Sequence, residues 1–193
     1  MQNSTILGKP QKGIKPLNLI AAPIGEDKGI LIADTYVREQ TYTGNLYTFS
    51  YGDDVASGTT VYFLLNVDSG YDVHIAYKIN SDKESTIAVY ENPDVSTNGT
   101  EVSSFNKNRN YSDTYNSVFY VGPSVNTEGD LLFDDDIFGE ANGRTITTSD
   151  GTFASGAEEW VFKAGNSYLL SYTNLSGNSA KLRVKATFFE EAV

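Results

Sequence analysis

The residues with a capacity for chemistry are few in this chain, and none of them lies in a known catalytic motif. The single histidine, His74, lies in a run that alternates apolar and polar side chains, and no Gly-x-Ser-x-Gly motif supplies a nucleophile. Cysteine is absent, which excludes disulfides, zinc–thiolate sites and cysteine nucleophiles. Glycine loops that bind phosphate are also absent. We therefore interpret His74 as a surface or interface residue and predict that the protein is not an enzyme and carries no cofactor.

Carboxylates are abundant, but their spacing does not identify a site. Asp134, Asp135 and Asp136 form the densest group, and hard cations accept carboxylates from loops. An EF-hand needs oxygens at alternate positions, a central glycine and a terminal glutamate, which the following Ile-Phe-Gly does not supply. A calcium site outside any known motif stays open. Paired acids for glycoside hydrolysis stay open too, because a chain with 25 acids meets that criterion in many ways.

The charge of the chain bears on its partners. The formal net charge of −11 argues against nucleic acid as a partner, because binding phosphates needs basic patches. No stretch approaches the roughly 18 consecutive apolar residues of a membrane span, and we expect neither a membrane partner nor a signal peptide. Three lysines and no acid lie between Met1 and Gly25, whereas nine acids and one arginine lie between Glu128 and Glu159. This asymmetry either steers a basic tail onto an acidic neighbour, such as a second copy, or only keeps the protein soluble.

The first 28 residues are predicted to form an extended arm. Three of the five prolines fall here and forbid a helix through them, while the apolar residues are too many for a merely disordered tail. The arm either binds a neighbouring subunit or packs along its own domain. The residues that would make the contact are Lys9, Lys12, Ile14, Lys15, Leu17, Leu19 and Ile20.

The elements that must position any site are strands. Thirteen Tyr and ten Phe favour strands over helices. Near the C-terminus Lys181–Phe188 alternates apolar and polar side chains, as in a strand with one buried face. A second strand is expected at Tyr168–Thr173, with turn residues between the two at Asn174–Ser179. Aromatic residues of this region form either a core or a sugar-binding platform, and the alternation favours the core for most of them; they are Trp160, Tyr168, Tyr172, Phe188 and Phe189.

The first half of the chain shows five further strand patterns. They cover Ile30–Arg38, Asn45–Tyr51, Thr60–Val67, Asp72–Asn80 and Ser85–Glu91. Thr60–Val67 is apolar on both faces, which is typical of a central strand. Because short turns join the last three, we expect them to form an antiparallel meander.

Residues 92–157 are predicted to hold long ordered loops that form the interaction surface. Nine glycines and prolines interrupt this stretch, and only Ser117–Val121, Leu131–Phe133 and Arg144–Thr148 resemble strands. No repeat of fixed period is visible, which argues against solenoids and propellers. The candidate contact residues are Asn108, Arg109, Asn110 and Phe138. The predicted fold is all-β: one antiparallel β-sandwich of jelly-roll type over residues 29–193, with the extended arm before it.

One family shares several of these features. The run Glu159-Trp160-Val161-Phe162-Lys163, then Gly165–Leu170, then Thr173–Gly177 and a closing strand that ends in Phe-Phe-Glu, resembles the ending of tailed-bacteriophage virion proteins. Asn108-Arg109-Asn110 and Asp136–Gly139 are similar to the middle region of that family. The resemblance covers roughly residues 45–191 and is to head decoration or auxiliary capsid proteins. Its motif consists of core aromatics and turn residues, and no catalytic residue comes with it.

The resemblance implies a structural function. A decoration protein binds the lattice of the major capsid protein and also its own copies, as a homotrimer or homodimer, on the capsid surface of the virion after synthesis in the host cytoplasm. An alternative is a head-fibre or tail-associated adhesin domain that binds host glycans through the loops of residues 92–157.

Overall fold

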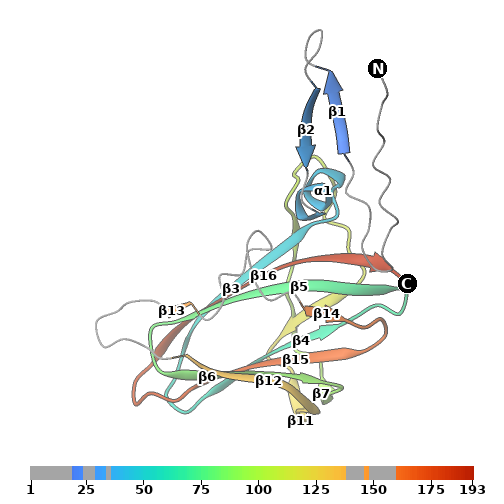
Figure 1. Ribbon diagram of the computed structural model, residues 1–193. Coiled ribbons are helices and arrows are strands. Elements are labelled where there is room, and N and C mark those ends of the chain that lie inside the picture. Colours follow the sequence, from blue (N-terminus) through green and yellow to red (C-terminus); the bar gives the residue numbers. More distant parts are fainter. Residues whose placement is uncertain (1–18, 24–28, 34–35, 138–145, 148–159) are drawn as a thin grey trace. The chain divides into compact units, whose positions relative to one another are not determined.

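The computed structural model describes residues 19–23, 29–33, 36–137, 146–147 and 160–193 (Figure 1). The chain divides into two compact units, Met1–Glu39 and Gln40–Val193. In the first unit, strand β1 (Leu19–Pro23) pairs with β2 (Gly29–Ala33) in an antiparallel hairpin. The second unit contains the core and every surface considered below.

One strand prediction is wrong at its end. Ile30–Arg38 was expected to be a single strand, but β2 ends at Ala33 and helix α1 covers Tyr36–Thr43. The helix ends at Gly44, which has a φ of 76° that suits glycine. The Gly44 N–H donates to Thr41 O (3.3 Å) and the Asn45 N–H to Gln40 O (2.8 Å), the hydrogen bonds of a Schellman motif.

The second unit is an antiparallel β-sandwich, as predicted. Sheet I has the order β12-β6-β15-β4-β10-β8 and sheet II the order β13-β5-β16-β3-β9, with β14 also paired to β5. Sheet I comprises β4 (Thr60–Asn66), β6 (Ser85–Glu91), β8 (Thr100–Glu101), β10 (Val118–Val121), β12 (Asp130–Ile137) and β15 (Ser167–Asn174). Sheet II comprises β3 (Tyr47–Val55), β5 (Tyr71–Ser81), β9 (Phe105–Asn106), β13 (Ile146–Thr147), β14 (Trp160–Phe162) and β16 (Ala180–Ala192).

The core lies between the two sheets and is rich in aromatic rings. Phe119 of sheet I lies 4.7 Å from Phe49 and 4.8 Å from Phe188 of sheet II, measured between ring centroids. Phe162 stacks on Tyr168 at 3.9 Å across the same interior. The prediction that most of the C-terminal aromatic rings are core is confirmed, since Tyr168, Tyr172, Phe188 and Phe189 are buried and Trp160 is half-buried.

Neighbouring strands in the sequence often lie in opposite sheets, which corrects the expected antiparallel meander. The meander predicted for the strands from Thr60 to Glu91 does not form, because β4 and β6 belong to sheet I and β5 to sheet II. Likewise β15 pairs with β4 and β6, whereas β16 pairs with β3 and β5. Each of these strands buries one face in the same core, so a short turn that crosses between layers satisfies the sequence pattern as well as a hairpin does. The jelly-roll topology stays a prediction.

A sequence motif occurs twice in the strands and loops of sheet I, although the chain shows no array of repeats with a fixed period. Tyr90–Gly99 and Tyr120–Gly129 share the pattern Tyr-x-x-Pro-x-Val-x-Thr-x-Gly. Each copy leaves a strand of sheet I and adds one short strand, β7 (Asp94–Thr97) or β11 (Ser124–Thr127), before it returns to the sheet. β7 pairs with β11 to form a two-stranded ribbon, with Val95 opposite Val125.

The two copies are related by a pseudo-twofold axis. Glu91 pairs with Asp130 on one side, and Val121 pairs with Thr100 at the equivalent place on the other. The glycines that end the two copies, Gly99 and Gly129, show the same symmetry. A Cβ on Gly99 would lie 2.4 Å from Val121 O, and one on Gly129 would lie 2.3 Å from Glu91 O. Each copy therefore needs its glycine because the backbone of the other copy occupies the space of a side chain.

The ribbon adds a third layer to the sandwich. Leu64 and Leu169 point away from sheet II, yet both are 0 % exposed. The ribbon lies on this outer side of sheet I (Figure 1). The Gly122 N–H donates to Tyr62 O (2.9 Å), which ties the start of the second copy to β4. The middle of sheet I, around Leu64 and Leu169, is thus covered on both faces, as the apolar pattern of Thr60–Val67 predicts for a central strand.

Candidate interaction surfaces

A polar loop, Ser104–Ser117, is held in shape by the buried side chain of Asn106. The Asn106 Nδ2 donates to Gly44 O (2.5 Å) and to Ser112 O (3.2 Å), while its Oδ1 accepts from the Asn108 N–H (2.9 Å). The residue is 1 % exposed. Because all three bonds go to main-chain groups, the amide substitutes for the secondary structure that this edge of sheet II lacks.

Asp113 supports the same loop from outside. Its Oδ1 accepts from the Asn106 N–H (2.5 Å) and from Nη1 of Arg109 (2.7 Å). The hydrogen bond from the Asn106 N–H, followed by that from Arg109, holds the pKa of the Asp113 carboxyl below its usual value. The Tyr47 hydroxyl donates to Thr114 O and anchors the far end of the loop. The loop is therefore ordered, as its composition predicts.

The loop brings together three of the four candidate contact residues. Asn110 and Arg109 are exposed, and Asn108 is partly buried with its side chain bonded to Tyr42 O (3.3 Å). Exposed aromatic rings lie in the same segment, Tyr111 at 49 % and Phe105 at 54 %. Phe138 lies outside the described residues. The arm residues Lys9, Lys12, Ile14, Lys15 and Leu17 also lie outside them, while Leu19 and Ile20 belong to β1.

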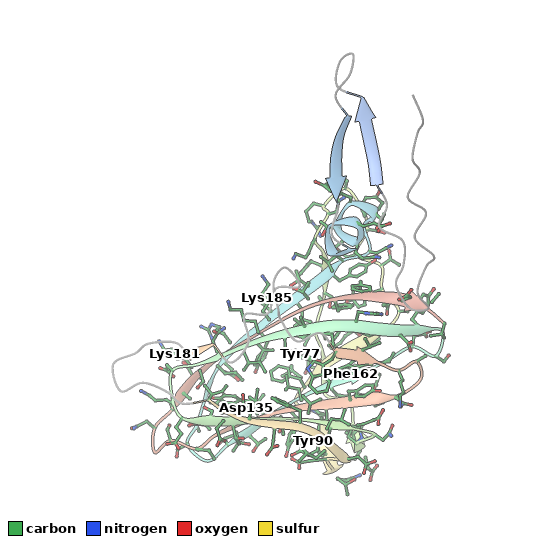
Figure 2. The ribbon with its side chains drawn as sticks, in the orientation of Figure 1. Tyr77, Tyr90, Asp135, Phe162, Lys181 and Lys185 are labelled. Atoms are coloured by element: carbon green, nitrogen blue, oxygen red, sulfur yellow. The ribbon has the colours of Figure 1, made fainter. Side chains whose placement is uncertain are left out.

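The outer face of sheet II carries a group of cations that we call the basic face: Lys78, Lys181, Arg183 and Lys185. In β16 the three cations alternate with the buried Leu182 and Val184 and point away from sheet I, and Lys78 lies opposite Lys185 on β5. Figure 2 shows Lys181 and Lys185 on this side, with Tyr77 and Phe162 between the sheets. Sequence reasoning identified the polar face of β16 but could not add Lys78, which only the strand pairing places there.

His74 lies further along the same outer face. Its ring stacks on Phe189 with centroids 4.4 Å apart, and its Nε2 lies 3.3 Å from a carboxylate oxygen of Glu191. The side chain of His74 is 17 % exposed. His74 thus lies on the outer face of sheet II as a partly exposed side chain held by Phe189 and Glu191.

The outer face of sheet I holds a carboxylate between two phenols. The Tyr62 hydroxyl donates to Oε1 of Glu128 (2.8 Å), and Tyr90 is hydrogen-bonded to the same carboxylate. Burial, followed by the bond to Glu128, raises the pKa of Tyr62 to about 12. The pKa of Tyr90 is raised for the same two reasons. Glu128 follows β11, so this cluster fastens the ribbon to the sheet.

The aspartates considered for calcium do not converge on one point. Asp134 and Asp136 lie on one face of β12 and Asp135 on the other, because side chains alternate along a strand. Within the described residues, no group of three or more His, Cys, Asp or Glu side chains is placed to hold a metal ion. Among the same residues, no helix is long and apolar enough to cross a membrane.

Comparison with known proteins adds no family. No family model matches the chain. No curated protein matches it either. The surfaces described above are thus the basis for any statement about function, together with the sequence resemblance.

Two features of these surfaces were missed from sequence. Asn106 falls inside the loops predicted for residues 92–157, but nothing in the neighbouring sequence shows that its side chain is buried. The duplicated motif was open to detection, since comparing the segment after Tyr90 with that after Tyr120 reveals it at once. A pair of copies does not produce the periodic signal that marks an array of repeats.

Proposed function

We propose that this chain is a structural virion protein of a tailed bacteriophage that decorates the capsid by binding the lattice of the major capsid protein. The observation that carries the proposal is the resemblance of residues 45–191 to that family, which lies in core aromatics and turn residues. A β-sandwich whose core contains Phe162, Tyr168 and Phe188 gives those residues the scaffold role that the resemblance implies.

The ordered polar loop also supports a binding role without catalysis. The polar loop is ordered by main-chain hydrogen bonds to Asn106, so it enters a complex with little loss of conformational entropy. Copies that each make modest contacts would bind a lattice tightly through multivalency. On this proposal the residues before β1, including Lys9, Lys12 and Lys15, contact a neighbouring subunit.

Two experiments test the proposal. An image reconstruction of the intact virion is expected to show the sandwich on the head. Deletion of residues 1–24 is expected to abolish binding to capsids that lack the protein, while the far-ultraviolet circular dichroism of the remaining chain keeps its β-sheet signature. Density confined to the tail would contradict the decoration function, and full capsid binding by the truncated chain would contradict the role of the arm.

A second candidate function is a glycan-binding adhesin domain. The observation that favours it is the exposure of Phe105 and Tyr111 beside the amides of the polar loop, since aromatic faces and amide groups together bind sugars. Binding of the purified protein to a glycan array, lost in Tyr111→Ala, would favour this function. An Asn126→Ala variant, altered in the ribbon, serves as the matched control.

A further inference from the structure

An exposed aromatic ring lies at the β9 edge of sheet II. Phe105 is opposite Thr48 of β3 in the strand register. Tyr47 and Phe49, on either side of Thr48, are buried in the core, so Thr48 and Phe105 point away from sheet I. The side chain of Phe105 stays in water, since the residue is 54 % exposed. A single exposed ring is ordinary by itself, so its neighbours decide whether it belongs to a binding site.

Two lysines lie on the same outer face, on either side of the level of this ring. Lys107 continues the pairing beyond β9, because its N–H donates to Leu46 O (2.8 Å). Side chains alternate along an extended chain, so Lys107 shares its face with Phe105, two residues before it. Lys185 of β16 lies opposite Ser50, on the other side of the Phe105 level (Figure 2). The ring therefore has one lysine before it and one after it along β3.

The two positive charges are close together and lack a counter-ion. Burial of the Lys107 ammonium group, and after it the charge of Lys185, holds the pKa of Lys107 below its usual value. Such an effect needs proximity, because surface charges more than about 10 Å apart are largely screened at about 0.1 M salt. Both lysines are exposed as whole residues, and no carboxylate among the described residues lies within ion-pair distance of either ammonium group. An anion between them would remove their repulsion.

The carboxylates of the neighbouring segments are engaged elsewhere. Asp113 accepts hydrogen bonds from the Asn106 N–H (2.5 Å) and from Nη1 of Arg109 (2.7 Å). Glu190 of β16 accepts from the Ser117 N–H (2.6 Å). Asp54 lies near the far end of β3, four residues beyond the level of Lys185. Each of these acids thus has its own donors or a position apart from the two lysines.

We propose that Phe105, Lys107 and Lys185 form a binding site for an acidic saccharide. The Phe105 ring contacts the apolar C–H face of a pyranose, and the carboxylate of the sugar lies between the two ammonium groups. In a uronic acid the carboxylate is attached to the pyranose ring, so one sugar makes both contacts. Nucleic acid does not fit, because two lysines in a chain of net charge −11 neutralise too few phosphates. The inference rests on the glycan-binding candidate function and names the class of glycan.

An amide NMR titration of the full chain with an oligogalacturonate tests the proposal. The largest shift changes are expected at Thr48, Phe105, Lys107 and Lys185, and the affinity is expected to fall at least about threefold between about 50 and about 300 mM salt. The double variant Lys107→Gln/Lys185→Gln is expected to bind at least about tenfold more weakly, because each lysine donates a charge-assisted hydrogen bond. Lys163→Gln, at an exposed lysine after β14, is the control and is expected to bind like the wild type. Equal urea midpoints show that the variants fold.

Two further ligands separate the charge from the sugar. The methyl ester of the same oligosaccharide keeps the rings without the charge, and polyglutamate keeps the charge without the rings; both are expected to bind more weakly than the oligogalacturonate. Equal binding of polyglutamate, or unchanged binding by the double variant, would overturn the proposal.

The fate of the glycan-binding candidate can be told apart from that of this site. Binding of the methyl ester alone, lost in Tyr111→Ala, would overturn the acidic site and support the candidate function. Binding of neither saccharide would contradict both. Binding of the oligogalacturonate that survives Tyr111→Ala but weakens at least about threefold in Phe105→Leu would support the site at β9.

Discussion

Asn106 is the residue on which the polar loop depends. Replacing it with alanine leaves Gly44 O, Ser112 O and the Asn108 N–H without partners at a site that is 1 % exposed. Each buried polar group left without a hydrogen bond costs about 1–3 kcal/mol. We expect Asn106→Ala to lower the free energy of unfolding by at least about 2 kcal/mol.

Urea denaturation followed by circular dichroism measures this change. The control is Asn110→Ala, which removes an exposed amide from the same loop and is expected to change the stability by no more than about 0.5 kcal/mol. Equal effects of the two substitutions would contradict the central role of Asn106.

The raised pKa of Tyr62 predicts how the free energy of unfolding changes at alkaline pH. Its pKa is raised to about 12 in the folded protein, above the ordinary value of 10.0. Between these values the unfolded chain loses the phenol proton while the folded chain retains it, so deprotonation favours unfolding. The stabilisation that the protonated Tyr62 hydroxyl adds to the folded protein is therefore complete below pH 10.0 and is lost as the pH rises towards 12.

The measurement is the urea midpoint between pH 9 and the onset of alkaline unfolding, compared between the wild type and Tyr62→Phe. We expect a shallower decline in the variant, though not a flat one, because the pKa of Tyr51 is also raised to about 12. Tyr111→Phe, at a residue that is 49 % exposed, is the control. An unchanged slope in Tyr62→Phe would show that the bond to Glu128 does not govern this response.

At the scale of elements, the pseudo-twofold symmetry of the duplicated motif predicts that Gly99 and Gly129 respond alike to substitution. A Cβ at Gly99 or Gly129 would lie within 2.4 Å of a carbonyl oxygen of the other copy, and both residues have φ near 90°. We expect Gly99→Ala and Gly129→Ala each to cost more than about 2 kcal/mol and to differ little from one another.

Gly122 provides the matched control within the same motif. It has φ 68° but open space around its Cβ position, and its counterpart in the first copy is Asn92 at φ 56°. Gly122→Asn is therefore expected to cost less than about 1 kcal/mol. Thermal or urea denaturation of the three variants distinguishes the cases. A large loss in Gly122→Asn with tolerance of Gly129→Ala would contradict the pseudo-twofold description.

At the scale of the whole molecule, the hydrophobic core lies within one of the two compact units. Every residue of the core cluster, from Tyr47 to Phe188, belongs to the unit Gln40–Val193. A protein comprising only these residues is expected to fold by itself and to unfold in one cooperative transition, because the core that drives folding is complete. Circular dichroism and urea denaturation check this, and a chain without a cooperative transition would show that Met1–Glu39 is needed.

The amino-acid sequence alone determined the all-β class, most of the strands and which face of each strand is buried. Leu182 and Val184 are buried and Lys181 and Arg183 exposed, because alternation along a strand is a local property that the chain carries in its order of residues. The order of the polar loop was likewise predictable, since asparagine and aspartate bond their own main chain. The helix Tyr36–Thr43 was missed because it is short, mostly polar and follows closely on the apolar run of β2, so its residues carry no clear helical periodicity.

Only the tertiary structure decided which strands pair and which side chains meet. β15 and β16 follow one another in the chain but lie in opposite sheets, and the pairing of β16 with β5 brings Lys78 beside Lys185. The same holds for Glu128, which meets Tyr62 and Tyr90 only because the ribbon folds over sheet I. The physical reason is that burial of a strand face is satisfied by either sheet of a sandwich, whereas pairing depends on contacts between residues far apart in the chain.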